Sequence, residues 1–154
     1  MPTTPMRPPG WTIALCACMF TLSPHRAVAQ ATDSSKTTAL TTLSGVFTTA
    51  QAVSGRSVYR ASCESCHTMT EFTGSSFWNE WVGKALAELF AYLKSSMPKD
   101  NPSSLSDDDY VNATAFILQM NQMPPGDKAL PPDSTALSKI KVVPPDPTKK
   151  GTRS

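Results

Sequence analysis

The chain is poor in the side chains that bind metals. Its 154 residues include only 4 cysteines and 2 histidines, and Cys16 and Cys18 lie in an apolar segment near the N-terminus. Beyond residue 30, the cysteine and histidine ligands are Cys63, Cys66 and His67. A structural zinc site takes four ligands, mostly from these two residue types. Zinc would need unusual carboxylate ligands as well, so the sequence argues against a structural zinc site.

The sequence contains no apolar run of the roughly 20 residues that a helix needs to cross a bilayer. Its longest, residues 11–22, follows Arg7 and precedes Ala27-Val28-Ala29. This order of basic, apolar and small residues is typical of a secretory signal peptide. We expect residues 1–29 to be removed, leaving a periplasmic chain without a transmembrane segment. A faint lipobox before Cys18 leaves lipid anchoring at that residue as an alternative.

Charge of neither sign dominates. The formal net charge is +2, and loss of Arg7 and Arg26 with the signal peptide would leave the basic residues equal in number to the 12 acidic residues. Binding to nucleic acid requires a basic stripe or patch, and the sequence has none. We therefore expect no nucleic-acid partner.

The length suits one domain of about 100 residues with appendages. Residues 30–44 are rich in Thr, Ser and Ala, which predicts a flexible leader. We assign residues 45–143 to the domain. Residues 144–154, rich in Pro and Lys, are expected to form a loose tail.

The cysteines and the histidine beyond residue 30 all belong to one short motif. Cys63-Glu64-Ser65-Cys66-His67 is a Cys-x-x-Cys-His sequence, the attachment signature of a c-type haem. The two thiols form thioethers with the vinyl groups, and the histidine becomes the proximal ligand of the iron. We expect one haem c, bound covalently through Cys63 and Cys66. A buried porphyrin would also supplement the modest hydrophobic content of 40%.

A redox disulfide between Cys63 and Cys66 is the main rival interpretation of the motif. It requires a βαβ context of the thioredoxin kind, and no parallel-strand pattern lies near these residues. The oxidising compartment expected for an exported chain suits a cysteine pair in either role.

Hydrophobic periodicity predicts helices throughout the domain. The first runs from Thr49 to Cys63, with Ala50, Val53 and Tyr59 on one side and Gly55 where another helix could cross closely. The second runs from Phe77 to Ser95. A third begins after the capping residue Ser106 and ends near Asn121, and a short one lies near residues 134–139. In the second, apolar residues recur at i, i+3, i+4 and i+7: Trp81, Val82, Ala85, Leu86, Leu89, Phe90 and Leu93.

The sequence also predicts a pocket wall for the haem. Aromatic and apolar side chains follow the motif closely in sequence, and for a small haem protein the core and the pocket wall are nearly the same. We assign Phe72, Trp78, Trp81 and Leu86 to the wall.

The sixth iron ligand is expected to be a methionine, because no second histidine follows the signal peptide. The candidates are Met69, Met97, Met120 and Met123. Met69 is too close to His67 in sequence to reach the opposite face of the ring, and Met120 shares a helix side with core residues. Met97, in an extended segment held by Pro98, is favoured, and Met123 stays open as an alternative.

The assembled motifs resemble those of the class I c-type cytochromes, above all the small cytochrome domains that accompany periplasmic quinoprotein-type dehydrogenases. The similarity runs from about Gly45 to Val142. It is carried by Gly45–Ala52, Gly55, Tyr59, Cys63–His67, Trp81–Lys84, Leu89-Phe90, Met97-Pro98, Asn101-Pro102, Leu105-Ser106 and Tyr110–Asn121.

The resemblance implies a small all-α fold, with three main helices and shorter ones wrapped around one haem. It also implies that Met97 and His67 ligate the iron, and that Gly55 meets Phe116 or Tyr110 where the first and last long helices cross.

The expected function is single-electron transfer by a periplasmic mono-haem cytochrome that is not itself an enzyme. It would act as electron acceptor or subunit for a redox partner, such as a periplasmic dehydrogenase or a terminal acceptor. A haem enzyme, or a gas or redox sensor with a displaceable sixth ligand, is the alternative. A module that uses haem only to fold stays open as well.

Overall fold

The computed structural model describes residues 39–146. The chain divides into two units, Met1–Ser35 and Lys36–Ser154, and every described residue belongs to the second. The predicted signal peptide, with Cys16 and Cys18, therefore lies outside the described residues. In the described part the elements are α1 (Thr49–Ser62), the 3-10 helix η1 (Met69–Phe72), α2 (Gly74–Trp81), α3 (Leu86–Ser96), α4 (Asp107–Met120) and α5 (Ser134–Leu137).

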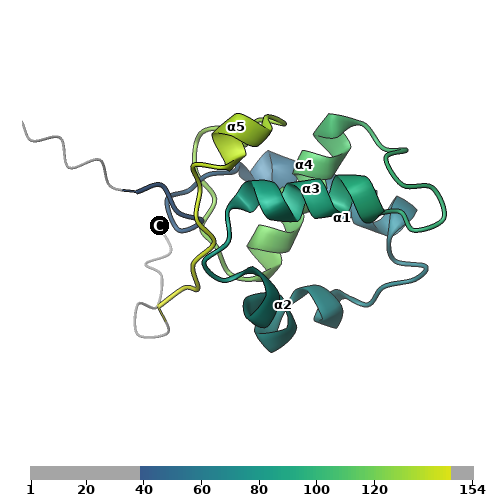
Figure 1. Ribbon diagram of the computed structural model, residues 1–154, viewed down its shortest axis with the longest axis horizontal. Helices are drawn as coiled ribbons and strands as arrows, with labels where there is room; N and C mark the ends of the chain where they lie inside the picture. Colours follow the sequence, from purple (N-terminus) through teal and green to yellow (C-terminus); the bar gives the residue numbers. More distant parts are fainter. Residues whose placement is uncertain (1–38, 147–154) are drawn as a thin grey trace, which may run out of the picture. The chain divides into compact units, whose positions relative to one another are not determined.

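The fold is all-α, as the sequence predicts. Residues 39–146 contain helices and two isolated β-bridges but no strand. Figure 1 shows α3 in front of α1 and α4, with α5 and α2 on opposite sides. Within the described residues, no helix is long and apolar enough to span a membrane.

Local capping determines where α1 and α4 begin. The Thr48 side chain accepts a hydrogen bond from the backbone of Gln51, and the Gln51 side chain accepts one from the Thr48 backbone, which completes a capping box. The Ser106 hydroxyl accepts from the backbone N–H of Asp109 at the start of α4. Three aspartates fill the first turn of α4, where the helix dipole stabilises negative charge. Both predicted helices are confirmed.

The close crossing of α1 and α4 is made possible by Gly55. Gly55 is buried, and a methyl group there would overlap the carbonyl oxygen of Asn112 and lie 2.9 Å from Cβ of Phe116. The Tyr59 and Phe116 rings pack beside it, with centroids 5.7 Å apart. The predicted contact between Gly55 and Phe116 is therefore confirmed.

The buried face of α1 differs from the predicted one. It consists of Ala52, Gly55 and Tyr59, whereas Ala50 is exposed and the Val53 side chain is 61% exposed. The close approach of α4 at Gly55 determines which side of α1 is buried. Val53 lies outside this contact and stays exposed although it is hydrophobic.

The predicted single helix from Phe77 to Ser95 is wrong, because the structure breaks it into α2 and α3. Gly83 lies at the break with φ of +79°, a left-handed conformation that glycine adopts without the strain of a side chain. Its backbone N–H donates to the Val142 carbonyl, and the Val142 N–H donates to the Lys84 carbonyl. This pairing uses backbone groups that a continuous helix would have used internally.

The C-terminal segment around Lys141 lies between two other parts of the chain and is hydrogen-bonded to both. Lys141 forms one bridge with Thr41 and another with Ala85. The hydroxyl of the fully buried Thr42 donates to the Val143 carbonyl at 3.2 Å. Residues 41–44, placed in the predicted leader, are thus packed against the domain in the structure. Leu130, Leu137 and Ile140 are buried, so the C-terminal segment before the predicted tail packs against the domain.

Replacing Gly55 by Ala is expected to destabilise the protein. Alanine favours a helix by about 1 kcal/mol relative to glycine, but its methyl group would force α1 and α4 apart. Such overpacking costs about 1–3 kcal/mol, and an overlap with the backbone oxygen of Asn112 places Gly55→Ala at the upper end. After subtraction of the helix-propensity gain of about 1 kcal/mol, we expect a net loss of about 2 kcal/mol. The check is the free energy of unfolding in guanidinium chloride, with Ser57→Ala at an exposed position of α1 as control. An unchanged or raised stability of Gly55→Ala would contradict the crossing described here.

Candidate functional site

A cavity of about 1090 Å³ lies between the segment after α1 and the segment that contains α3. This volume is slightly above the range of about 300–1,000 Å³ typical of ligand and cofactor sites. Six of the eight residues predicted for the site line it: Cys63, Cys66, His67, Phe72, Trp81 and Met97.

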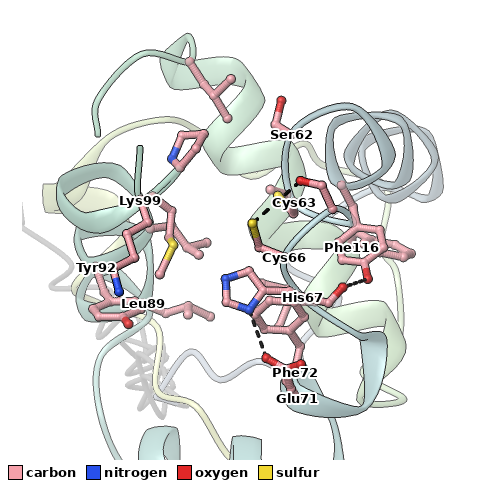
Figure 2. A pocket seen from close by; sticks show the side chains of 18 of the residues that line it. Ser62, Cys63, Cys66, His67, Glu71, Phe72, Leu89, Tyr92, Lys99 and Phe116 are labelled. Carbon is pink, nitrogen blue, oxygen red and sulfur yellow. Dashed lines mark hydrogen bonds and ion pairs between the residues drawn. The ribbon is translucent and has the colours of Figure 1, made fainter. Parts of the chain in front are cut away.

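The cavity has two walls from different parts of the chain. Figure 2 shows Leu89, Tyr92 and Lys99 on one side and Cys66 and His67 on the other, with the imidazole directed into the space between them. Met97 follows the last residue of α3 and belongs to the same segment as Leu89, Tyr92 and Lys99.

Two predicted wall residues do not line the cavity. Leu86 is fully buried in the hydrophobic core, and Trp78 packs edge-on against Phe77 with ring centroids 4.9 Å apart. The assignment of Trp78 rests on its closeness to the motif in sequence, which does not determine the direction of its side chain. That of Leu86 assumes one continuous helix, and the break at Gly83 changes which residues share a face with it. The wall instead includes apolar side chains that the sequence analysis did not assign to it: Tyr59, Phe77, Leu89, Tyr92, Leu93, Phe116 and Ile117.

Among the four candidate methionines, Met97 lines the cavity. Met123 is a core residue with 2% of its surface exposed, and Met120 packs against that core. Met69 is 36% exposed and does not line the cavity. The alternative ligand Met123 is thus removed from the site by its burial elsewhere.

The two cysteines of the motif lie at the end of α1 as free thiols. The Cys63 N–H donates to the Tyr59 carbonyl, and the His67 N–H donates to the Cys63 carbonyl, each at 2.9 Å. These bonds continue the helical turn and place Cys63, Cys66 and His67 on the same cavity. Burial raises the pKa of the Cys63 thiol above its ordinary value.

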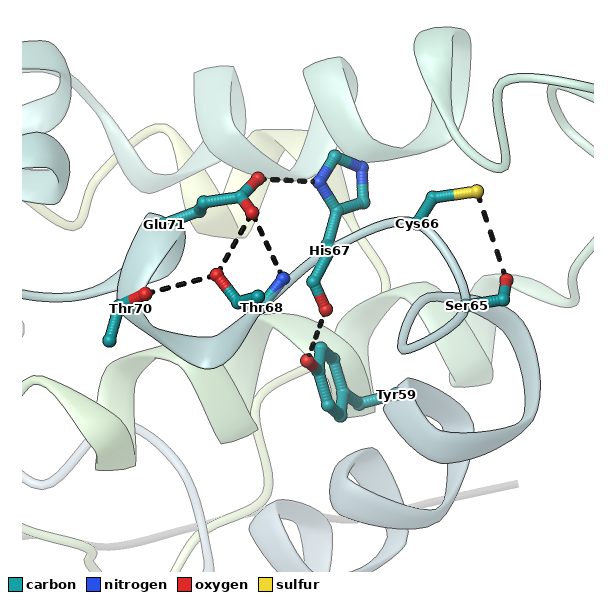
Figure 3. A network of polar contacts seen from close by, with 7 residues as sticks. All are labelled: Tyr59, Ser65, Cys66, His67, Thr68, Thr70 and Glu71. Atoms are coloured by element: carbon teal, nitrogen blue, oxygen red, sulfur yellow. Dashed lines mark hydrogen bonds and ion pairs between the residues drawn. The ribbon is translucent and has the colours of Figure 1, made fainter.

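The His67 ring is oriented by a carboxylate. Its Nδ1 lies 2.9 Å from Oε2 of Glu71, as Figure 3 shows. The hydrogen bond with His67, followed by those with Thr68, lowers the pKa of Glu71 to about 2. An ionised carboxylate can only accept, so Nδ1 must carry the hydrogen. In a neutral imidazole this leaves the lone pair on Nε2 available to a metal.

Two buried tyrosines hold the backbone on the two sides of the cavity. The Tyr59 hydroxyl of α1 donates to the His67 carbonyl at 2.6 Å. The Tyr110 hydroxyl of α4 donates to the Met97 carbonyl, also at 2.6 Å. Burial is the first cause that raises the pKa of Tyr59, which keeps its hydroxyl protonated as a donor. The α1–α4 pair thereby fixes the backbone at both candidate iron ligands.

Asn121 ties the site to the end of α4. Its buried amide nitrogen donates to the Phe72 carbonyl at 2.7 Å and to the Ile117 carbonyl at 2.9 Å. This contact holds the end of η1, where Phe72 lines the cavity, against the α4 helix. Glu71 could have been found in the sequence by its i+4 spacing from His67, whereas the roles of Tyr59, Tyr110 and Asn121 depend on tertiary contacts.

The donor set does not resemble a conventional metal site. Over residues 39–146, no group of three or more His, Cys, Asp or Glu side chains is placed to hold a metal ion. The described cavity instead combines two thiols, one imidazole and one thioether with aromatic and aliphatic walls.

Comparison with known proteins gives one match to a family model. Residues 50–117 match the family model described as cytochrome c oxidase, cbb3-type, subunit III. This stretch includes the Cys63–His67 motif, Met97 and the crossing of α1 with α4. Neither the curated proteins nor the solved structures gave a match.

The match and the helical fold support a c-type cytochrome domain. The architecture is consistent with the small all-α fold of class I cytochromes c. A domain of this class implies electron transfer by haem, with haem c as the cofactor.

Replacing Tyr110 by Phe is expected to lower stability by about 1–2 kcal/mol, because the Met97 carbonyl loses its hydrogen-bond donor. The matched control is Tyr92→Phe, where the side chain is 48% exposed and the change should stay within about 0.5 kcal/mol. The measurement is the free energy of unfolding of both variants. Equal effects at the two positions would argue against a specific role of the Tyr110 hydroxyl.

Proposed function

We propose that the chain is an exported mono-haem c-type cytochrome that transfers single electrons in the periplasm. His67 and Met97 would be the axial ligands of the iron, and Cys63 and Cys66 would attach the haem. The observation that carries this proposal is the cavity with the Cys-x-x-Cys-His motif on one wall and Met97 in the segment that forms the other.

The residues of the cavity fit a covalently attached haem. Free thiols, an imidazole with Nε2 available and a thioether match the attachment and ligation that such a group needs. Phe72, Leu89 and Ile117 belong to an apolar wall suited to a porphyrin face. When bound, the haem supplies an iron that cycles between the ferric and ferrous states, and ligation by Met and His raises its reduction potential.

The partner is proposed to be a redox protein, such as a periplasmic dehydrogenase for which this domain acts as electron acceptor or subunit, or a terminal acceptor. The predicted signal peptide supports the periplasmic location. A cytochrome that serves such partners docks through a small and transient interface.

Met97→Ala tests the axial ligand. The variant should keep covalent haem but open the sixth position, which gives a high-spin spectrum without the sulfur-to-iron charge-transfer band. Reduced Met97→Ala should bind carbon monoxide readily, whereas the wild type should bind it poorly. The control is Met69→Ala, which removes a thioether two residues from His67 that does not line the cavity. Its spectrum should match the wild type.

Two results would reject the ligand assignment or the function. Retention of the charge-transfer band in Met97→Ala would exclude Met97 as ligand. A high-spin wild-type protein that binds carbon monoxide would favour a haem enzyme or a sensor over an electron carrier.

A further inference from the structure

The Glu71 carboxylate uses both oxygens to link the histidine to its own loop. Oε2 lies 2.9 Å from Nδ1 of His67. Oε1 accepts from the Thr68 backbone N–H at 3.0 Å and from the Thr68 hydroxyl at 2.9 Å. The carboxylate is thus held in place by the turn that opens η1, and it cannot rotate away from His67 without losing these bonds.

We propose that Glu71 is a positioning residue that lowers the reduction potential of the haem iron by acting through His67. The inference rests on the proposed function, because it requires His67 to ligate iron through Nε2. Glu71 would present the proximal imidazole with a charged hydrogen-bond acceptor in place of a neutral one.

The direction of the effect follows from charge. A carboxylate that accepts the second ring N–H fixes the tautomer of a metal-bound histidine and raises its basicity. Ferric iron carries one more positive charge than ferrous iron, so it gains more from a more basic imidazole. The ferric state is stabilised relative to the ferrous state, and the potential falls. Glu71 therefore opposes the increase that a methionine ligand produces.

The hydrogen bond between Glu71 and His67 should affect the reduction potential more than the negative charge of Glu71 acting at a distance. The Glu71 side chain is 51% exposed and that of His67 28%, so solvent and salt screen a purely Coulombic effect. Hydrogen bonds to an ionised acceptor are about twice as strong as neutral ones. A short contact from Glu71 can thus affect the iron where other exposed acids on the cavity cannot.

Glu80 provides the matched control. It also lines the cavity and is 61% exposed, but its carboxylate pairs with Lys84 at 2.5 Å instead of the histidine. Glu80→Gln and Glu71→Gln remove the same charge from the same protein. Glutamine at position 71 keeps an oxygen acceptor near His67, so the substitution tests the charge of the acceptor.

The test is a spectroelectrochemical titration of the haem-loaded protein. We expect Glu71→Gln to change the preference for ferric over ferrous iron about tenfold. For a one-electron couple this is a rise of about 59 mV in midpoint potential. Glu80→Gln should shift the potential far less, and the sulfur-to-iron charge-transfer band should persist in both variants.

Two further variants separate the effect from loop stability. Thr68→Val removes a hydroxyl that holds Oε1 but leaves the contact of Oε2 with His67, so its potential should stay near the wild-type value. Glu71→Asp keeps the charge but withdraws the carboxylate by one methylene, and its potential should rise as in Glu71→Gln. Should Glu71→Gln fail to load haem, Glu71→Asp provides the same comparison.

Three outcomes would overturn the inference alone: equal shifts in Glu71→Gln and Glu80→Gln, a wild-type potential in Glu71→Asp, or a Thr68→Val shift as large as that of Glu71→Gln. A wild-type protein without covalent haem and the charge-transfer band would instead reject the proposed function, and the inference with it.

Discussion

The structure depends on the close approach of α1 and α4 at Gly55. The absence of a side chain there lets the two helices touch through backbone and through the Phe116 ring. Each helix then contributes one buried tyrosine, and each tyrosine holds a carbonyl on a different wall of the cavity. The separation of the walls is therefore determined by a helix contact, while the segments that carry the candidate ligands are themselves irregular.

The geometry of the cavity depends on two kinds of contact: one holds the backbone of His67 and Met97, and the other orients the His67 ring. The tyrosines fix the backbone of His67 and Met97 by hydrogen bonds from α1 and α4 to the two carbonyls. The orientation of the His67 ring is determined locally, by a carboxylate four residues further along the chain. The position of the His67 backbone and the orientation of the His67 ring are thus set by two different side chains, Tyr59 and Glu71.

Local signals in the sequence predicted much of the fold. Apolar periodicity from Thr49 predicted α1, the capping residue Ser106 predicted the start of α4, and the Cys63–His67 motif identified the cavity in which Met97 also lies. The break between α2 and α3 was missed because it depends on pairing between Gly83 and Val142, which are distant in sequence. The missed break accounts for the misplacement of Leu86, whereas Trp78 was misplaced because closeness to the motif in sequence does not determine which way a side chain points. The identity of the iron ligands stays a prediction.

The hydrogen bonds between the first described residues and the C-terminal segment also determine where the domain can be attached to other structures. The Thr42 N–H donates to the Lys141 carbonyl, and the Lys141 N–H donates to the Leu40 carbonyl. The two ends of the described domain therefore leave it at one place. A membrane anchor attached through one end, or another protein attached through the other, would hold the domain from the same point.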